Sequence, residues 1–290
     1  MVGERRLTPY KLLVYIVLLM CCFFVLYPLY YMVIVSISDG YAVSRGEVKF
    51  YPQGVNLEAY KAVFRYSTVP RSYLNSVIYT VMGTFISVTM TSLCAYPLSR
   101  KKMFGREVLT FFVAFTMFFD AGLVANYLVV RSLHMLNTLW AIVIPGAVNV
   151  WYMIIMRTFY GSISEEMYES AYIDGANDLQ VYHKIVLPLS KAVIATMILF
   201  YAVNFWNSYI PPLLYLNSRT KFPMPLLLRN IVLGSDNISF SSTSVSSDLS
   251  VLGTNIRYAV IFITILPILL IYPFVQKYFV KGIMIGSIKG

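Results

Sequence analysis

Four residues near the end of one apolar stretch have side chains that could hold a sugar. They are Tyr201, Asn204, Trp206 and Asn207, and they fall within about three turns of a helix. Sugars are commonly held by aromatic faces together with amide hydrogen bonds, and two asparagines three residues apart share one helix face. The same side chains also suit an interfacial aromatic belt with amides that pack helices together. The sequence leaves both interpretations open.

A second candidate site is an acidic segment in an otherwise apolar chain. Residues 162–188 hold five of the chain's 13 acidic residues, namely Glu165, Glu166, Glu169, Asp174 and Asp178. Ser162 followed three residues later by Glu165 predicts a capping box, and acids in the first turn suit the positive end of a helix. Gly175 can adopt the left-handed conformation that ends a helix. A short helix that stops at a glycine turn is therefore predicted.

A second helix should follow this turn. Asn177 with Gln180 three residues later predicts its start, and the residue before Pro188 is its predicted stop. The whole segment is thus expected to form two short helices that lead into the next apolar stretch.

One face of the first short helix is small enough for the close approach of a partner, and it is formed by Met167, Ser170, Ala171 and Asp174. A carboxylate such as Glu169 could pair with a basic residue on that partner. The alternative is an amphipathic helix at the lipid headgroups, which normally carries Lys and Arg on its polar face. Because acidic residues are repelled by an anionic inner leaflet, docking of a partner is the favoured interpretation.

The composition indicates which elements position these residues. With 58% hydrophobic and 12% charged residues and a mean hydropathy of +0.68, the 290-residue chain is more apolar than a soluble core requires. A helix needs about 20 apolar residues to cross the hydrocarbon. We therefore predict an all-α membrane protein with about six transmembrane helices, at approximately 12–38, 74–98, 104–123, 138–156, 189–216 and 258–276. The acidic segment would lie between helices 4 and 5.

The basic residues predict the orientation of these helices. The formal net charge is +10, and short basic clusters occur within residues 5–11, 100–106 and 277–281. With six spans these clusters all fall on one side, which the positive-inside rule assigns to the cytoplasm. Both termini and the acidic segment are therefore expected in the cytoplasm. The predicted organisation is a cytoplasmic N-terminus, a transmembrane domain and a cytoplasmic C-terminal tail, at residues 1–11, 12–280 and 281–290.

Other function classes find less support. The chain has no Gly-x4-Gly-Lys-Ser/Thr phosphate loop, so ATP would have to be hydrolysed by another subunit. Its two histidines fall on opposite sides of the membrane, so no catalytic or metal-binding set is predicted. The basic clusters suit lipid headgroups and do not predict nucleic-acid binding. An ion-coupled secondary transporter is an alternative that needs a carboxylate inside a span, whereas the helical rise from Lys102 places Asp120 at the outer surface.

The spacing in the acidic segment resembles a known motif. Glu169-Ser170-Ala171, three residues, Gly175, nine residues, Ile185, one residue and Leu187-Pro188 are similar to the EAA loop of bacterial ABC importer permeases. Ser170 stands where that family usually has alanine. The AYPLSRK sequence after the second span, the Trp206-Asn207 pair and the terminal KGIMIGSIKG resemble the MalG-like half of the maltose-type sugar permeases.

This resemblance implies a function and partners. The chain would be a permease subunit of an ATP-driven carbohydrate ABC importer in a bacterial cell membrane, forming half of the path for an oligosaccharide. A cytoplasmic ATPase dimer would bind ATP and Mg, so no cofactor is expected in this chain. A MalF-like second permease would complete the path, and a solute-binding protein would contact the outer loop 217–257. An ABC permease for a non-sugar solute is the nearest alternative.

The resemblance also implies roles for particular residues. The tail from Lys281 to Gly290 would reach toward the ATPase interface. The residues implied to form the element that couples to the ATPase are Glu169, Ser170, Ala171, Gly175, Ile185, Leu187 and Pro188.

Overall fold

The described chain is built from helices, without a strand in any of the described ranges. A computed structural model describes residues 9–65, 68–119, 121–233 and 253–287, and the side chains of the last range up to residue 273. The predicted all-α fold is confirmed. The helices before the acidic segment are α1 (Pro9–Ser36), α2 (Gly40–Ser44), α3 (Glu58–Arg65), α4 (Thr68–Ser99), α5 (Arg106–Phe115), α6 (Gly122–Ser132), α7 (Trp140–Val143) and α8 (Val150–Tyr160).

The acidic segment and the remainder of the chain form shorter pieces followed by one long helix. These elements are α9 (Glu165–Ile173), α10 (Asp178–Val181), the π-helix η1 (Tyr182–Val186), α11 (Leu187–Leu189), α12 (Lys191–Asn207), α13 (Ile210–Tyr215), the 3-10 helix η2 (Arg219–Lys221), α14 (Met224–Val232) and α16 (Gly253–Ser287).

Three helices of the described chain are long and apolar enough to cross a membrane. They are α1, α4 and the Gly253–Pro273 part of α16. A fourth candidate is a bent pair, Asp178–Leu189 with Lys191–Asn207, whose two parts meet at 82°. The three long helices overlap the first, second and sixth predicted spans. Of the bent pair, Lys191–Asn207 lies within the fifth predicted span, 189–216, whereas Asp178–Leu189 belongs to the acidic segment. The count of six spans stays a prediction.

The third predicted span, 104–123, is not one helix. It contains α5, which has 10 residues, and turns that follow it before α6 starts at Gly122. Ten helical residues rise about 15 Å, half the hydrocarbon thickness of a bilayer. Gly122 has a φ of 79°, which breaks the helical path.

The fourth predicted span, 138–156, is also divided. α7 ends before Pro145, which cannot donate a backbone hydrogen bond to continue the helix. α8 then begins with Asn149 as its N-cap, whose side chain accepts a hydrogen bond from the Tyr152 backbone N–H at 3.2 Å. A proline and a strong N-cap within a few residues therefore replace one span by two short helices.

The helices form two compact units. One comprises Met1–Ser67 and Leu228–Leu266, and the other Thr68–Leu227 and Pro267–Gly290. In the first unit, the buried Asn255 side chain of α16 donates to the backbone carbonyls of Val35 and Ser38 at 2.9 and 2.8 Å. These bonds satisfy carbonyls that the C-terminal end of α1 leaves free.

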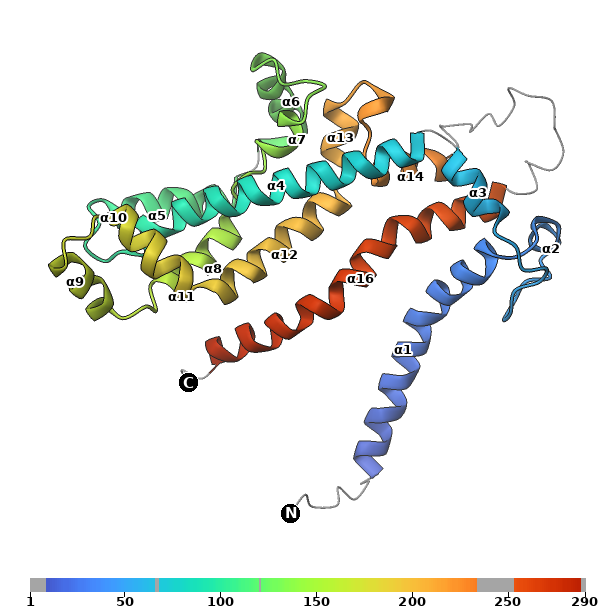
Figure 1. The fold of residues 1–290 in the computed structure, drawn as a ribbon, viewed down its shortest axis with the longest axis horizontal. Coiled ribbons are helices and arrows are strands. Elements are labelled where there is room, and N and C mark those ends of the chain that lie inside the picture. The colour runs from blue at the N-terminus through green and yellow to red at the C-terminus, as the bar shows by residue number, and fades with distance from the viewer. Residues whose placement is uncertain (1–8, 66–67, 120, 234–252, 288–290) are drawn as a thin grey trace. The chain divides into compact units, whose positions relative to one another are not determined.

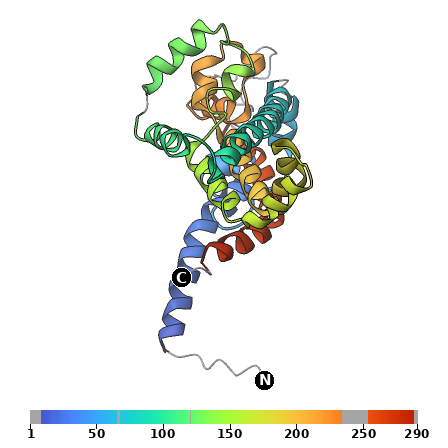
Figure 2. The same cartoon turned by 90° about the vertical axis from the view of Figure 1, so that its left-hand side faces the viewer.

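The second unit contains both candidate sites and is organised around α4. α12 runs antiparallel to α4, and α8 packs against both (Figure 1). Gly83 allows a close approach, because a Cβ atom there would lie 2.7 Å from the Phe205 ring. The acidic segment lies beside the C-terminal end of α4, as Figures 1 and 2 both show. Residues 204–207 lie toward the opposite end of this helix pair.

Some predictions fall on residues that the structure does not describe. These are Asp120 and residues 234–252 of the outer loop expected to contact a binding protein. The expected tail, 281–290, begins inside α16, which continues as a helix to Ser287.

Candidate functional site

The EAA segment, residues 162–188, begins differently from the prediction. α9 starts at Glu165 with Ser164 at the N-cap position, and the Ser162 hydroxyl donates to the Phe159 carbonyl at 2.7 Å. The predicted capping box between Ser162 and Glu165 is therefore wrong. Ser162 lies in the turn that ends α8, where the free carbonyls of that helix are the nearer acceptors.

The glycine turn and the second helix start are confirmed. Gly175 has a φ of 79°, the left-handed conformation predicted for it. At the start of α10 the Asn177 side chain accepts from the Gln180 backbone N–H, and the Gln180 side chain accepts from the Asn177 backbone N–H, both at 2.9 Å. These reciprocal bonds fix the connection between α9 and α10.

The predicted helix stop before Pro188 is wrong. The chain passes from α10 into the π-helix η1 and then into α11, which contains Pro188. Proline in an α-helix clashes with the carbonyl four residues earlier, and the wider π turn directly before it relieves this constraint. The sharp bend of 82° comes after Leu189 instead.

One face of α9 is buried within its own unit. Tyr168 and Ala171 are 1% and 8% exposed, and both belong to a core cluster with residues of α4, α8 and α12. The predicted docking face is therefore divided, because Met167, Ser170 and Asp174 are exposed whereas Ala171 is not. Helical geometry places Ala171 beside Tyr168, three residues earlier.

Tyr168 holds α9 against α8 and the end of α4. Its hydroxyl donates to the Tyr160 carbonyl at 3.4 Å, and the Arg100 guanidinium lies 3.5 Å from its ring centroid. Burial raises the pKa of the Tyr168 phenol, and the Arg100 charge lowers it in part. The phenol is therefore neutral at physiological pH and acts as a hydrogen-bond donor.

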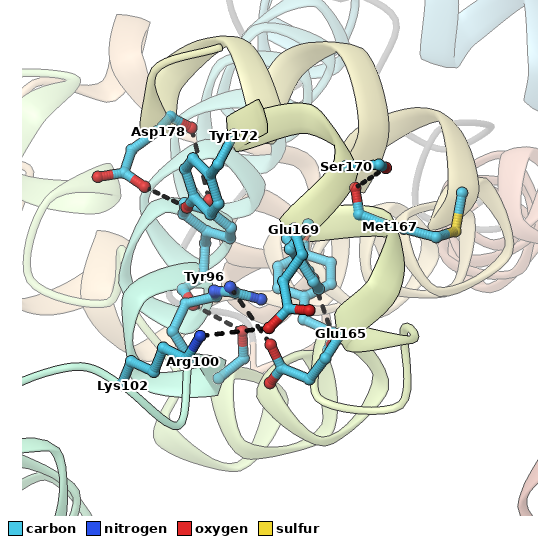
Figure 3. Close-up of polar contacts among 12 residues, drawn as sticks. Tyr96, Arg100, Lys102, Glu165, Met167, Glu169, Ser170, Tyr172 and Asp178 are labelled. Carbon is cyan, nitrogen blue, oxygen red and sulfur yellow. Dashed lines mark hydrogen bonds and ion pairs between the residues drawn. The ribbon is translucent and has the colours of Figure 1, made fainter. Parts of the chain in front are cut away.

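Two ion pairs join α9 to the region around the turn between α4 and α5 (Figure 3). Glu165 pairs with Arg100 at 3.5 Å, and Glu169 pairs with Lys102 at 3.3 Å. The expectation that Glu169 pairs with a basic residue on a partner is thus corrected, since its ion pair is within the chain. The Lys102 and Glu169 side chains are 78% and 58% exposed, so their pair contributes only about 0–1 kcal/mol.

A further hydrogen bond closes the Gly175 turn. The Tyr172 hydroxyl donates to the Asp178 Oδ1 atom at 2.6 Å, as drawn in Figure 3. Burial raises the pKa of the Tyr172 phenol, and the Asp178 carboxylate raises it further. The neutral phenol therefore links α9 to α10 at physiological pH.

The other side of the EAA segment presents apolar side chains on the surface of the described chain. Ile173 is 85% exposed, Leu179 65% and Met167 42%. The Ser170 hydroxyl donates to the Met167 carbonyl of its own helix at 3.2 Å, so it adds little polarity. We call Met167, Ile173 and Leu179 the apolar surface of the EAA segment. An exposed apolar surface bordered by acids is typical of a protein interface.

The last three motif residues lie around the π turn. Ile185 and Leu187 are half-buried and pack against the core cluster, whereas Pro188 is exposed. Ile185 and Leu187 therefore anchor the EAA segment to its own unit, and Pro188 stands at its surface.

A buried serine connects the EAA segment to α4 and α8. The Ser92 hydroxyl of α4 shares one hydrogen bond with the Tyr160 hydroxyl of α8, at 2.7 Å, and one with the Tyr182 hydroxyl of η1, at 2.6 Å. All three residues are buried. The sequence analysis missed this network, because the many hydroxyl residues of α4 do not reveal their partners.

Tyr201 lies beneath the other candidate site and not at its surface. It is buried, and its hydroxyl shares a hydrogen bond with the Thr91 hydroxyl at 2.6 Å and accepts one from the Asn149 backbone N–H at 2.9 Å. The phenol oxygen is thus occupied by bonds to α4 and to the start of α8. In this arrangement Tyr201 supports α12.

Asn204, Trp206 and Asn207 line an open cavity of about 1040 Å³ in the second unit. Both asparagines are exposed on α12. The Trp206 ring packs edge to face with the Tyr73 ring of α4, with ring centroids 5.6 Å apart. Among the described residues, the lining includes aromatic, apolar and neutral polar side chains but no charged one. Such a lining suits a neutral polar ligand with apolar faces.

Two residues of this cavity were missed by sequence reasoning. Tyr73 and Tyr152 come from α4 and α8, and they lie at the cavity only because both helices pack against α12. Their aromatic type was the only signal, and tyrosine is too common in this chain to single them out.

The geometry defines a class: an all-helical membrane protein with an exposed acidic segment at one end of a helix pair and a cavity near the other. The chain belongs to the family described as the binding-protein-dependent transport system inner membrane component, which matches residues 59–285. This family and the saccharide transport proteins described next confirm the resemblance to carbohydrate ABC importer permeases.

Similar proteins agree with this assignment. The polygalacturonan/rhamnogalacturonan transport system permease protein YtcP of Bacillus subtilis is 40% identical over 281 residues, which cover 97% of this chain and 98% of YtcP. Protein LplC of the same organism is 40% identical over 263 residues, covering 91% and 89%. A crystal structure of a bacterial ABC transporter involved in the import of the acidic polysaccharide alginate matches with a TM-score of 0.86 and 32% identity, covering 96% of this chain and 99% of that one.

Proposed function

We propose that this chain is the transmembrane permease subunit of an ATP-driven ABC importer and forms half of the path for an oligosaccharide. Its family membership and the saccharide transport named for YtcP and for the alginate importer support the proposal. The subunit itself is not an enzyme. A separate ATPase dimer binds ATP and Mg, a MalF-like second permease completes the path, and an extracytoplasmic binding protein delivers the sugar. The complex lies in the bacterial cell membrane with both termini of this chain in the cytoplasm.

The observation that carries the proposal is that the chain runs from the EAA segment directly into the helix that lines the cavity. α11 joins the EAA segment to α12, and α12 carries the cavity residues at its other end. Closure of the ATPase dimer would push on the apolar surface formed by Met167, Ile173 and Leu179. Because Ile185 and Leu187 anchor the segment to the core cluster, this movement would reach α12 and change access to the cavity.

The cavity chemistry supports a sugar as the transported solute. Aromatic and apolar walls can cover the apolar faces of sugar rings, while the amides of Asn204 and Asn207 can both donate to and accept from hydroxyls. Its volume of about 1040 Å³ lies at the upper end for small-molecule sites, which suits more than a single sugar ring. In this proposal Tyr201 positions α12 beneath the sugar.

Transport by the reconstituted complex tests the proposal. The permease, its partner subunits and the binding protein would be placed in vesicles with ATP at the ATPase side, and uptake of labelled oligogalacturonides, alginate oligosaccharides and maltooligosaccharides would be measured. We expect ATP-dependent uptake of at least one of them. Uptake driven by an ion gradient without ATP would instead indicate a secondary transporter. ATP-dependent uptake of amino acids or phosphonates alone would indicate a permease for a non-sugar solute.

A further inference from the structure

Two arginines in the second unit lack an acidic partner within the part of the chain that the structure describes. Near the turn between α4 and α5, Arg100 and Lys102 are paired with acids of α9. Arg106 at the start of α5 and Arg157 near the end of α8 form no ion pair with any described residue. Glu107, the nearest acid in sequence, also pairs with neither.

Both arginines are half-buried, which makes the missing counter-charge costly. The Arg157 Nε–H donates to the Leu98 carbonyl at the end of α4, at 3.0 Å. The Arg106 Nε atom is buried without a hydrogen-bond partner in the described chain. Burial lowers the pKa of Arg157, and the neighbouring charge of Arg106 lowers it further. Like charges that are partly desolvated repel each other, and an anion beside them would stabilise both.

The helix that begins at this place adds positive potential. Arg106 is the first residue of α5, and Gly105 before it offers no side chain to cap the free N–H groups of the first turn. The positive end of the helix dipole therefore lies at Arg106, and Glu107 in the first turn offsets part of it.

Beyond the charged end, α5 is apolar and uncovered within the described chain. None of its residues is buried, and α5 lies at the edge of the unit in Figure 2. An uncovered apolar helix that begins at a basic residue matches the two parts of a phospholipid. The exposed apolar residues of α5 are Val108, Leu109, Phe111, Phe112 and Phe115.

We propose that Arg106 and Arg157 bind the phosphate of an anionic phospholipid whose acyl chains lie along α5. Charge complementarity selects the lipid, because the site presents two cations and a helix N-terminus against one acid, Glu107, which forms no ion pair with either arginine. The predicted membrane boundary near residue 104 places the site at headgroup level. This inference goes beyond the proposed transport function and does not depend on which solute is carried.

Headgroup selectivity of the complete complex tests the site. The complex would be reconstituted in phosphatidylcholine vesicles with traces of spin-labelled phosphatidylglycerol or phosphatidylcholine, and the motionally restricted lipid would be measured. Since each basic residue near an anionic headgroup contributes about five-fold in affinity, we expect the two arginines to give a preference for phosphatidylglycerol of about 25-fold. The Arg106→Gln/Arg157→Gln variant should lose most of it, and the Arg106→Lys/Arg157→Lys variant should retain most of it.

A matched control separates a local site from general charge. Lys101→Gln/Lys184→Gln removes the same charge from two exposed residues and should preserve the preference. Equal loss in this control would overturn the proposal, and so would an unchanged preference in the double glutamine variant. If the double variant does not assemble, the two single glutamine variants take its place, each with an expected loss of about five-fold.

Two further outcomes identify a different occupant. Absence of any preference in the wild-type complex would mean that a carboxylate of a partner subunit fills the site. Loss of the preference when inorganic phosphate replaces chloride at equal ionic strength would mean that the site takes free phosphate. Either result would overturn the proposal without bearing on sugar transport.

Discussion

The EAA segment and the cavity use opposite chemistry. The EAA segment is held to its unit by buried tyrosines and by ion pairs with Arg100 and Lys102, and its outer side is apolar. The cavity has a lining free of charge in its described part, with two amides standing out from aromatic walls. The first arrangement suits a firm element that transmits force, and the second suits a ligand that must be released after each cycle.

The two regions also differ in how they depend on burial. The inner face of the EAA segment contributes to the stability of the fold, since Tyr168 and Ala171 form part of a core cluster. In the cavity the exposed Asn204 and Asn207 can change without disturbing the fold. Substitutions at the first site should therefore change stability and transport together, and substitutions at the second should change transport alone.

The largest effect is expected for Ala171→Asp. A carboxylate placed in the core cluster has no partner there, so we expect a loss of about 3 kcal/mol or more in stability and a near-complete loss of uptake. Thermal unfolding of the purified complex and vesicle uptake measure both. Ser170→Asp is the matched control, because Ser170 is exposed and the change should stay within about 0.5 kcal/mol in stability. Equal effects at the two positions would contradict the inward orientation of Ala171.

A smaller loss is expected for Ser92→Ala. The substitution leaves the buried hydroxyls of Tyr160 and Tyr182 without their shared partner, which costs about 2 kcal/mol. We expect uptake to fall several-fold while basal ATP hydrolysis by the complex persists, since the EAA segment is loosened from α4. Ser132→Ala serves as control, because that hydroxyl bonds only to the Val129 carbonyl of its own helix. An equal decline of uptake and ATP hydrolysis would show that Ser92 serves stability alone.

The cavity should respond with a change in affinity. Asn204→Ala and Asn207→Ala should each raise the half-saturating sugar concentration about five-fold, the value of one lost hydrogen bond of about 1 kcal/mol, without a change in melting temperature. Tyr201→Phe should lower the melting temperature and leave the half-saturating sugar concentration unchanged, because the Tyr201 hydroxyl bonds to Thr91 and to the Asn149 backbone. If Tyr201→Phe instead raised the half-saturating concentration and left the melting temperature unchanged, Tyr201 would be a residue that contacts the sugar.

The smallest effect is expected for Lys102→Gln. Its ion pair with Glu169 is exposed, so the free energy of unfolding should fall by less than about 1 kcal/mol, and high salt should remove the difference. Arg100→Gln should cost more, since Arg100 is half-buried and also stacks on Tyr168. The free energy of unfolding of the two variants, measured at low and at high ionic strength, tests this difference. A larger effect at Lys102 than at Arg100 would refute this ranking.

Local signals in the sequence identified much of the EAA segment. The glycine turn at Gly175 and the capping box at Asn177 each depend on residues within one turn of the chain, and both are confirmed. The predicted helix start at Ser162 and the predicted helix stop before Pro188 were wrong, although these predictions also rest on local rules. At Ser162 the end of α8 supplies a nearer acceptor for the hydroxyl. Before Pro188 the π turn η1 lets the helix continue through the proline.

The apolar composition, the helical fold and the EAA spacing are properties of the sequence alone, because hydropathy and capping act over neighbouring residues. Only the tertiary structure decided that Ala171 faces inward, that Glu169 pairs with Lys102, and that Tyr73 meets Trp206 at one cavity. These contacts join residues far apart in the chain. They depend on how α4, α8, α9 and α12 pack together, which is set by the fit of many side chains at once and has no local signature.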